Sequence, residues 1–301
     1  PEYRTLQTEL RHWVQRHVAQ SQPITARSRP HQAALEAAQQ QGRTILASLL
    51  ENTELDTLIA ALDGRYVRPG PAGDILRNPA VLPTGRNLYQ FDPRRVPSPS
   101  AVQRGAEIAQ NTLDAHMQAH GRYPQSVAVV LWGLETAQTH GETIGQILAY
   151  LGVRLSQAHG LWEHRVEVIP LAELGRPRID VTIQICGFFR DMFPQAMNLL
   201  NDAFAAVASL DESDDQNNVR KNTVLLHQQL LSQGLTEQDA TELSRARIFG
   251  PAASQYGTDL TRIVGSGNWH AEADLVSAYL ASLQHVYTPK RYGESVQGLL
   301  T

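Results

Sequence analysis

The segment Thr139-His140-Gly141-Glu142 places an imidazole and a carboxylate two positions apart, directly before a helical pattern at 142–151. Both groups accept protons and bind metal ions. The apolar run 127–132 just upstream is typical of a buried parallel strand, and ligands of open α/β sheets bind beyond the carboxyl ends of strands. Two interpretations fit these residues: a base or metal site, in which the helix start favours ionised Glu142, or an ordinary first-turn acid beside a solvated histidine.

A second candidate is the run Gly187-Phe188-Phe189-Arg190-Asp191, which follows the apolar run 180–185 and opens a helix. If both apolar runs are parallel strands, this run lies on the same sheet edge as His140. Arg190 can hold a carboxylate in a planar two-pronged geometry, and Asp191 can bind metal. The alternative is structural: Asp191 caps the helix with Arg190 as its ion-pair partner, and the two phenylalanines pack in the core.

A third feature is the segment 64–99, which is rich in proline and glycine but also carries Asp74, Arg77 and Asn78. Long loops without regular structure are uncommon in compact domains unless they are functional. Prolines restrict such a loop, while glycines permit turns and close backbone approach. Substrate binding and hydrogen bonding within the loop both explain its polar residues.

The rest of the chain predicts the elements that position these residues. Apolar periodicity predicts helices at 4–20, 31–50, 55–62, 100–119, 142–151, 193–210, 219–233, 236–246 and 272–284. Short apolar runs predict strands at 127–132, 166–170 and 180–185, and 133–141 reads as a loop. The alternation of strand and helix predicts an α/β fold, a parallel sheet with flanking helices plus a helical N-terminal segment. We expect two domains, 1–99 and 100–301.

Composition and missing motifs exclude several classes of function. The net charge of −4 gives no reason to expect nucleic-acid binding. There is no GxxxxGK[ST] phosphate loop, no HExxH, no paired CxxC and no GxSxG in the 301 residues. No apolar run is long enough to span a bilayer, and no signal peptide is visible. The single cysteine, Cys186, is expected to be a small buried hydrophobe, compatible with a reducing cytoplasm.

Four runs resemble one family, in the same order along the chain. They are GPAGDILRNPAVLPTGRNLYQFDP (70–93), VLWGLETAQTHGETIGQILAYLGV (130–153), LGRPRIDVTIQICGFFRDMFPQAMNLL (174–200) and RIFGPAASQYGT (247–258). They are similar to the large subunit of ATP-dependent tetrapyrrole metal chelatases, the family of the cobaltochelatase CobN subunit and the magnesium-chelatase H subunit. The resemblance covers about residues 60 to 290. Because those subunits are much longer, we expect this chain to be a fragment of a larger multidomain subunit.

The resemblance implies that the chain helps to insert a divalent metal into a porphyrin or corrin-type ring. Glu142 matches the place of an acid implicated in catalysis, as base or metal ligand, with His140 as accessory ligand and Glu107 as a further acid. Arg190 would anchor a ring carboxylate. Residues implied in substrate binding also include Asp191, Asp74, Arg77 and Asn78. The runs GFFRDMFP and RIFGPAASQYG look more like the cobalt enzyme, so cobalt is favoured and magnesium insertion in chlorophyll synthesis is the alternative.

The family also implies partners. Separate AAA+ ATPase and adaptor subunits use the ATP, which agrees with the missing phosphate loop. The divalent metal, cobalt or magnesium, is then a substrate, the ring is the second substrate, and the location is cytoplasmic. Two other classes of function remain: a non-catalytic tetrapyrrole-binding module, and an interaction scaffold for the ATPase subunits.

Overall fold

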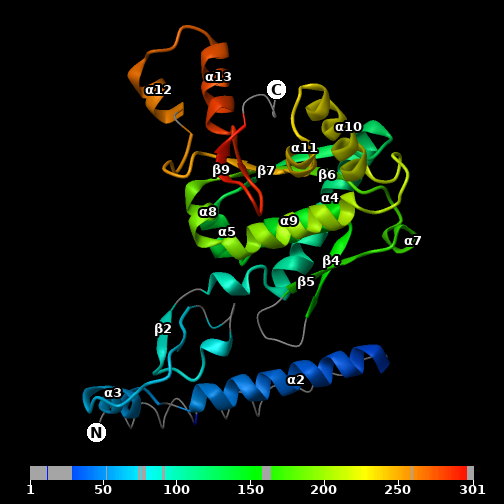
Figure 1. The fold of residues 1–301 in the computed structure, drawn as a ribbon. Helices are drawn as coiled ribbons and strands as arrows, with labels where there is room; N and C mark the ends of the chain where they lie inside the picture. Colours follow the sequence, from blue (N-terminus) through cyan, green and yellow to red (C-terminus); the bar gives the residue numbers. More distant parts are fainter. Residues whose placement is uncertain are drawn as a thin grey trace. The chain divides into compact units, whose positions relative to one another are not determined.

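The computed structural model describes residues 12, 29–51, 53–73, 75, 79–89, 92–157, 164–258 and 260–296. The predicted helix at 4–20 lies outside them except for His12, and the candidates Asp74, Arg77 and Asn78 lie outside them altogether. Contacts divide the chain into two compact units, Pro1–Asp92 and Pro93–Thr301. Figure 1 shows both, coloured along the sequence.

The described residues of the first unit form two helices and part of the proline- and glycine-rich segment. Helices α2 (Arg29–Leu50) and α3 (Glu54–Leu62) match predicted helices. The loop elements are β1 (Gly70–Pro71), η1 (Pro79–Val81) and β2 (Asn87–Tyr89), with β1 and β2 parallel. The Asn87 amide donates hydrogen bonds to the carbonyls of Pro71 and Val81. The described part of this loop is therefore held by its own hydrogen bonds.

The second unit is built on a five-stranded sheet of order β3-β6-β7-β8-β9. Strands β3 (Ser126–Leu131), β6 (Asp180–Ile185) and β7 (Ile248–Gly250) are parallel to one another. Strand β8 (His285–Tyr287) pairs antiparallel with β7, and β9 (Tyr292–Ser295) pairs antiparallel with β8. The sequence thus correctly predicts β3 and β6 as parallel strands. It misses β7 to β9, because runs of three or four residues carry too little periodicity to be recognised.

Ten helices are described around this sheet (Figure 1). They are α4 (Pro99–His120), α5 (Gly133–Thr139), α6 (Glu142–Leu151), α7 (Leu171–Leu174), α8 (Gly187–Met192), α9 (Pro194–Ala208), α10 (Asn218–Ser232), α11 (Glu237–Leu243), α12 (Leu260–Ser266) and α13 (Glu272–Ser282). A short 3-10 turn, η2 (Pro93–Arg95), precedes α4. The prediction of a loop over 133–141 is wrong, since α5 occupies most of it. Among the described residues, no helix combines the length and apolar composition needed to cross a bilayer.

The strand predicted at 166–170 does not join the main sheet. Strand β5 (His164–Val168) pairs instead with β4 (Val153–Gln157) in a separate antiparallel ribbon. Along β5, Arg165 and Glu167 are exposed while Val166 and Val168 are half-buried, an alternation typical of a strand with one solvent-exposed face. Arg154 on β4 forms an ion pair of 2.7 Å with Glu167.

Helices α4 and α6 approach so closely that glycine is required between them. A Cβ at Gly105 would lie 2.3 Å from the carbonyl oxygen of Glu142 and 2.4 Å from the amide nitrogen of Gln146. A Cβ at Gly145 would lie 2.7 Å from Cα of Val102. These glycines let the backbones touch, and the contact fixes the start of α6, where Glu142 stands.

We expect Gly105→Ala to destabilise the second unit by about 1–3 kcal/mol, because the added methyl group meets backbone atoms that cannot rotate away. Thermal unfolding followed by circular dichroism measures the change. Gly265→Ala on α12 is the matched control: no heavy atom lies within 4 Å of its added Cβ, so a gain of about 0.5–1 kcal/mol is expected. Equal stability of Gly105→Ala and the unmodified protein would contradict the close approach.

A buried arginine ties several segments to the end of α6. The Arg178 side chain is fully buried and donates to the carbonyls of Leu151, Gly152 and Ile169. It also forms a two-pronged ion pair with Glu212, at 2.8 and 2.9 Å. The acidic segment 211–215 is therefore only partly the surface segment its composition suggests, since Glu212 turns inward to neutralise a buried charge.

Candidate active site

Three of the runs singled out in the sequence meet at the carboxyl edge of β3, β6 and β7. A Cβ at Gly133, after β3, would lie 2.2 Å from the ring of Phe188, after β6. A Cβ at Gly187 would lie 2.6 Å from Cα of Tyr256, in the segment after β7. The amide of Gly187 also donates to the carbonyl of Tyr256, at 2.8 Å. Glycines thus let three separate turns pack into one surface.

Cys186 joins two of these turns. Its half-buried sulfur accepts hydrogen bonds from the amides of Gly133, at 3.4 Å, and Phe189, at 3.5 Å. It therefore caps α8, the role that the sequence offered to Asp191, and is more than the apolar filler expected from its neighbours. The spacing of residues along the chain gives no sign of this contact, because it joins two strands.

Aromatic side chains stand exposed at this edge. Trp132, Phe188 and Tyr256 expose 58%, 42% and 65% of their surface, whereas Phe189 is fully buried and packs on Phe193 with 5.2 Å between ring centroids. Of the two phenylalanines, only Phe188 is available to a ligand. The sequence cannot separate them, because adjacent residues on a short helix point in directions that only the surroundings decide.

A hollow of about 190 Å³ opens at the same edge, with Trp132, Cys186 and Tyr279 in its walls. Pockets that enclose drug-sized ligands measure roughly 300–1,000 Å³. This hollow is therefore too small to enclose a flat macrocycle.

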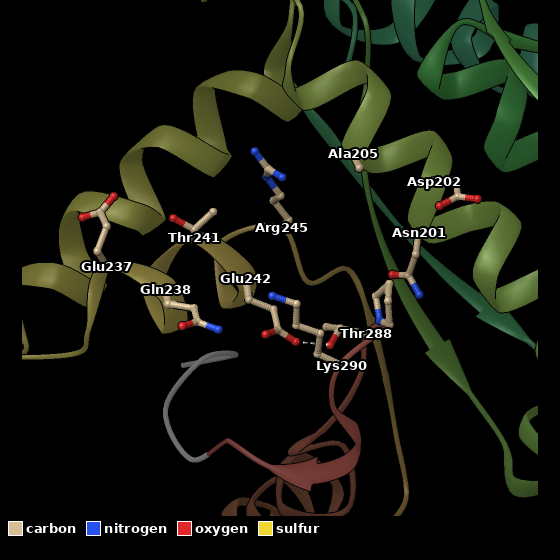
Figure 2. Close-up of a pocket in the computed structure, with 11 residues that line it drawn as sticks. Asn201, Asp202, Ala205, Glu237, Gln238, Thr241, Glu242, Arg245, Thr288 and Lys290 are labelled. Atoms are coloured by element: carbon tan, nitrogen blue, oxygen red, sulfur yellow. Dashed lines mark hydrogen bonds between the residues drawn. The ribbon is translucent and has the colours of Figure 1, made fainter.

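Larger hollows lie elsewhere in the described part of the chain, and two of them stand out by volume. One of about 490 Å³ is bordered by α9, α11 and the 288–290 turn, where Thr288 donates to Glu242 at 2.6 Å (Figure 2). No candidate residue from the sequence lines it. The other, of about 430 Å³, lies within the first unit, between α3 and the loop residues Val67, Pro69 and 85–88. The proline- and glycine-rich loop thus does line a hollow, although its role in a site remains a prediction.

His140 and Glu142 lie at the far end of α5, roughly 10 Å from the glycine contacts by the rise of a seven-residue helix. Both are half-buried. His140 is in the left-handed conformation, with φ of 57°, and its carbonyl accepts from the amide of Ser98 at 3.0 Å. Glu142 is the first residue of α6. Helix α5 thus links the pair to the aromatic surface.

Arg190 and Asp191 form a clamp on the turn that follows β7. The Arg190 guanidinium pairs with Asp191 at 2.7 and 3.1 Å and donates to the carbonyls of Ala252 and Gln255. The hydrogen bond to Asp191 raises the pKa of Arg190, and the same bond lowers the pKa of Asp191, assisted by Tyr256. With its side chain 3% exposed, Arg190 must give up one of these partners to hold a ring carboxylate, so its anchoring role stays a prediction.

Glu107 stands apart from the other candidates. The buried residues of α4 include Gly105 and Ala109, and Glu107 lies midway between them, on the opposite side of the helix. Its carboxylate is exposed and pairs with Arg104 at 3.3 Å. Within the part of the chain that the structure describes, no three histidine, cysteine or acidic side chains gather into a metal cluster, so His140 and Glu142 offer at most a partial ligand set.

The structure also brings in Glu135, which the sequence did not single out, and gives Thr139 a contact. Glu135 and Thr139 lie four positions apart on α5, and the Thr139 hydroxyl donates to the Glu135 carboxylate at 3.1 Å. The signal for this pair is helical spacing, which is lost once 133–141 is taken for a loop.

Known proteins share most of the length of this chain. The family model described as CobN/Magnesium Chelatase matches residues 2–301. The magnesium-chelatase subunit ChlH of Oryza sativa subsp. japonica is 39% identical over 78% of this chain and 17% of its own length. The aerobic cobaltochelatase subunit CobN of a Sinorhizobium species is 36% identical over 82% of this chain and 19% of its own length.

Among solved structures, the catalytic subunit of cobaltochelatase from Mycobacterium tuberculosis matches with a TM-score of 0.66 and 37% identity, over 89% of this chain and 22% of that one. The chain therefore spans about a fifth of the length of the relatives it matches. Sequence runs, fold and comparisons agree, and the chain belongs to the CobN/magnesium chelatase family.

Proposed function

We propose that this chain carries the base and the ring-contacting edge of a metal chelatase that inserts a divalent metal, with cobalt favoured, into a tetrapyrrole. The observation that carries the proposal is the meeting of three strand-end turns in one surface with exposed Trp132, Phe188 and Tyr256, joined by α5 to His140 and Glu142. Separate AAA+ ATPase subunits supply the ATP-driven step, and we place the reaction in the cytoplasm.

The chemistry assigns a task to each part. Metal insertion removes two pyrrole N–H protons from the ring as the dication gives up water and binds the ring nitrogens. Glu142 accepts a pyrrole proton, and His140 assists as metal ligand or second proton acceptor. The aromatic side chains stack on the ring face, and Arg190 with Asp191 holds the turn that carries Tyr256. In this proposal Glu107 is not part of the group formed by His140, Glu142 and the aromatic side chains.

Magnesium insertion is the second candidate, because magnesium-chelatase subunits match this chain as well as cobaltochelatase subunits do. A non-catalytic tetrapyrrole-binding module would use the same aromatic surface without a base. Titrating the full-length protein with hydrogenobyrinic acid diamide and, separately, with protoporphyrin distinguishes the rings: tighter binding of the first supports cobalt chemistry, and tighter binding of the second supports magnesium chemistry.

We expect Trp132→Ala to weaken ring binding about tenfold, equivalent to about 1.4 kcal/mol, because the side chain is more than half exposed at the proposed ring surface. The change in ring absorbance on titration measures the affinity. Trp269→Ala, at a tryptophan that is 39% exposed between α12 and α13, is the matched control and should bind like the unmodified protein. Unchanged affinity in Trp132→Ala, or no ring binding by the unmodified protein, would remove the basis for this surface.

A further inference from the structure

The helix that carries Glu142 starts without a capping side chain of its own. Its N-cap residue is Gly141, which has no side chain to accept from the free amides of the first turn. The Thr139 hydroxyl does this instead, because it accepts from the amides of Gly141, at 3.3 Å, and Glu142, at 3.2 Å. The backbone position of Glu142 therefore depends on the direction in which the Thr139 hydroxyl points.

Glu135 fixes that direction. One oxygen of its carboxylate accepts hydrogen bonds from the hydroxyls of Thr139 and Thr143, both at 3.1 Å. Because the Thr139 hydroxyl donates its one hydrogen bond to Glu135, the lone pairs of the Thr139 oxygen are free to accept from the two backbone amides. Glu135 thus joins the end of α5 to the first turn of α6 at a half-buried position.

The turn needs this support. His140 is the only residue other than glycine with a positive φ in the described part of the chain, a conformation that persists only where surrounding contacts impose it. On its other side the turn is held by the Ser98 amide and by close packing of Gly141, whose Cβ would lie 2.9 Å from Val96. The turn is therefore fixed from two directions, by segment 96–98 and by Glu135 through Thr139.

We propose that Glu135 and Thr139 are positioning residues for the reaction: they hold the strained turn and the start of α6 so that Glu142 meets the ring nitrogens. The inference rests on the proposed function in its assignment of Glu142 as base. Neither residue is required to touch the ring. A misplacement of about 1 Å at a reacting group can cost about a hundredfold in rate, so loosening the turn slows the proton transfer more than it weakens ring binding.

The test uses the full-length protein with its ATPase partners. We expect Thr139→Val, which keeps the shape of threonine but lacks the hydroxyl, to lower kcat for metal insertion at least tenfold with KM for the ring within about twofold. Thr139→Ser keeps the hydroxyl and should restore kcat to within about threefold of the unmodified protein. Glu135→Gln, which keeps an accepting oxygen, should lose less than Glu135→Ala. Thr112→Val, at an exposed threonine of α4, is the control and should keep full activity.

A general loss of stability would also lower the apparent kcat at unchanged KM, because it reduces the amount of active protein. The thermal unfolding midpoint of each variant is therefore measured as well, and kcat is compared only between variants that are folded at the assay temperature. Full kcat in Thr139→Val, or equal loss in the valine and serine variants, overturns the inference. Glu142→Gln distinguishes failure of the positioning role from failure of the assigned base. If that variant is inactive while Thr139→Val is fully active, only the positioning role fails; if it is fully active, the assignment of the base fails.

Discussion

Replacing Glu142 by glutamine is expected to lower the rate of metal insertion by at least about a hundredfold, the lower range of what a positioned general base contributes. Glutamine has nearly the same shape and still fits the first turn of α6, but it cannot accept a pyrrole proton. Ring affinity should therefore stay within about twofold. The change in ring absorbance on metallation, measured with the full-length protein, its ATPase partners and saturating ATP, gives the rate.

Glu173→Gln is the matched control. Glu173 is an exposed acid of α7 that pairs with Arg154 at 2.8 Å, far along the chain from the proposed base, and its loss should leave the rate unchanged. Glu107→Gln tests the remaining acid separately, and a loss as large as that of Glu142→Gln would move the base to α4. A full insertion rate in Glu142→Gln with intact ring binding would instead refute Glu142 as the base.

The second large effect is on stability. Asp180→Ala is expected to destabilise the second unit by about 3–5 kcal/mol, because it leaves the charge of Arg247 buried without its partner. The two side chains are each 6% exposed and lie 2.8 Å apart. The other oxygen of Asp180 accepts from Asn222 at 2.8 Å, so that hydrogen bond is lost as well. Thermal unfolding should show a midpoint lower by about 10 °C for a unit of this size.

The loss of stability expected for Asp180→Ala depends on the burial of the ion pair, and an exposed ion pair serves as the comparison. Asp214 and Arg220 lie 3.3 Å apart but Asp214 is 64% exposed, so Asp214→Ala should cost about 0–1 kcal/mol. Replacing both buried partners, as in Asp180→Leu with Arg247→Met, should cost less than Asp180→Ala alone, because no unpaired charge remains. A double variant less stable than the single variant would contradict this account.

This ion pair also bears on the site. Asp180 begins β6, and Arg247 directly precedes β7. Arg247 also donates to the carbonyls of Ser244 and Ala246 and to the hydroxyl of Thr223. The pair therefore sets the register of the two strands at their amino ends. The opposite ends of the same strands carry Cys186 and the turn clamped by Arg190. A shift of register in the sheet would displace the proposed ring surface.

The sequence by itself determined the elements with a strong apolar pattern and the family. Helices α4, α6 and α9 and strand β6 were predicted near their observed bounds, because each buries a regular face that periodicity reveals. Helix α2 and strand β3 were predicted as well, although the described residues of α2 are mostly exposed and β3 buries Leu131 alone. The position of His140 and Glu142 after a strand and before a helix also followed from the sequence. The four quoted runs were enough to identify the chelatase family.

Only the tertiary structure decided the partners of the site residues. Helix α5 and strands β7 to β9 are three to seven residues long, so their stability comes from packing on neighbours rather than from local pattern. Contacts between distant parts of the chain decide three features of the site: Phe188 is exposed while Phe189 is buried, Cys186 caps α8, and Arg190 holds the turn after β7. Such contacts carry no local signal, because a side chain's role is set by what the fold brings beside it.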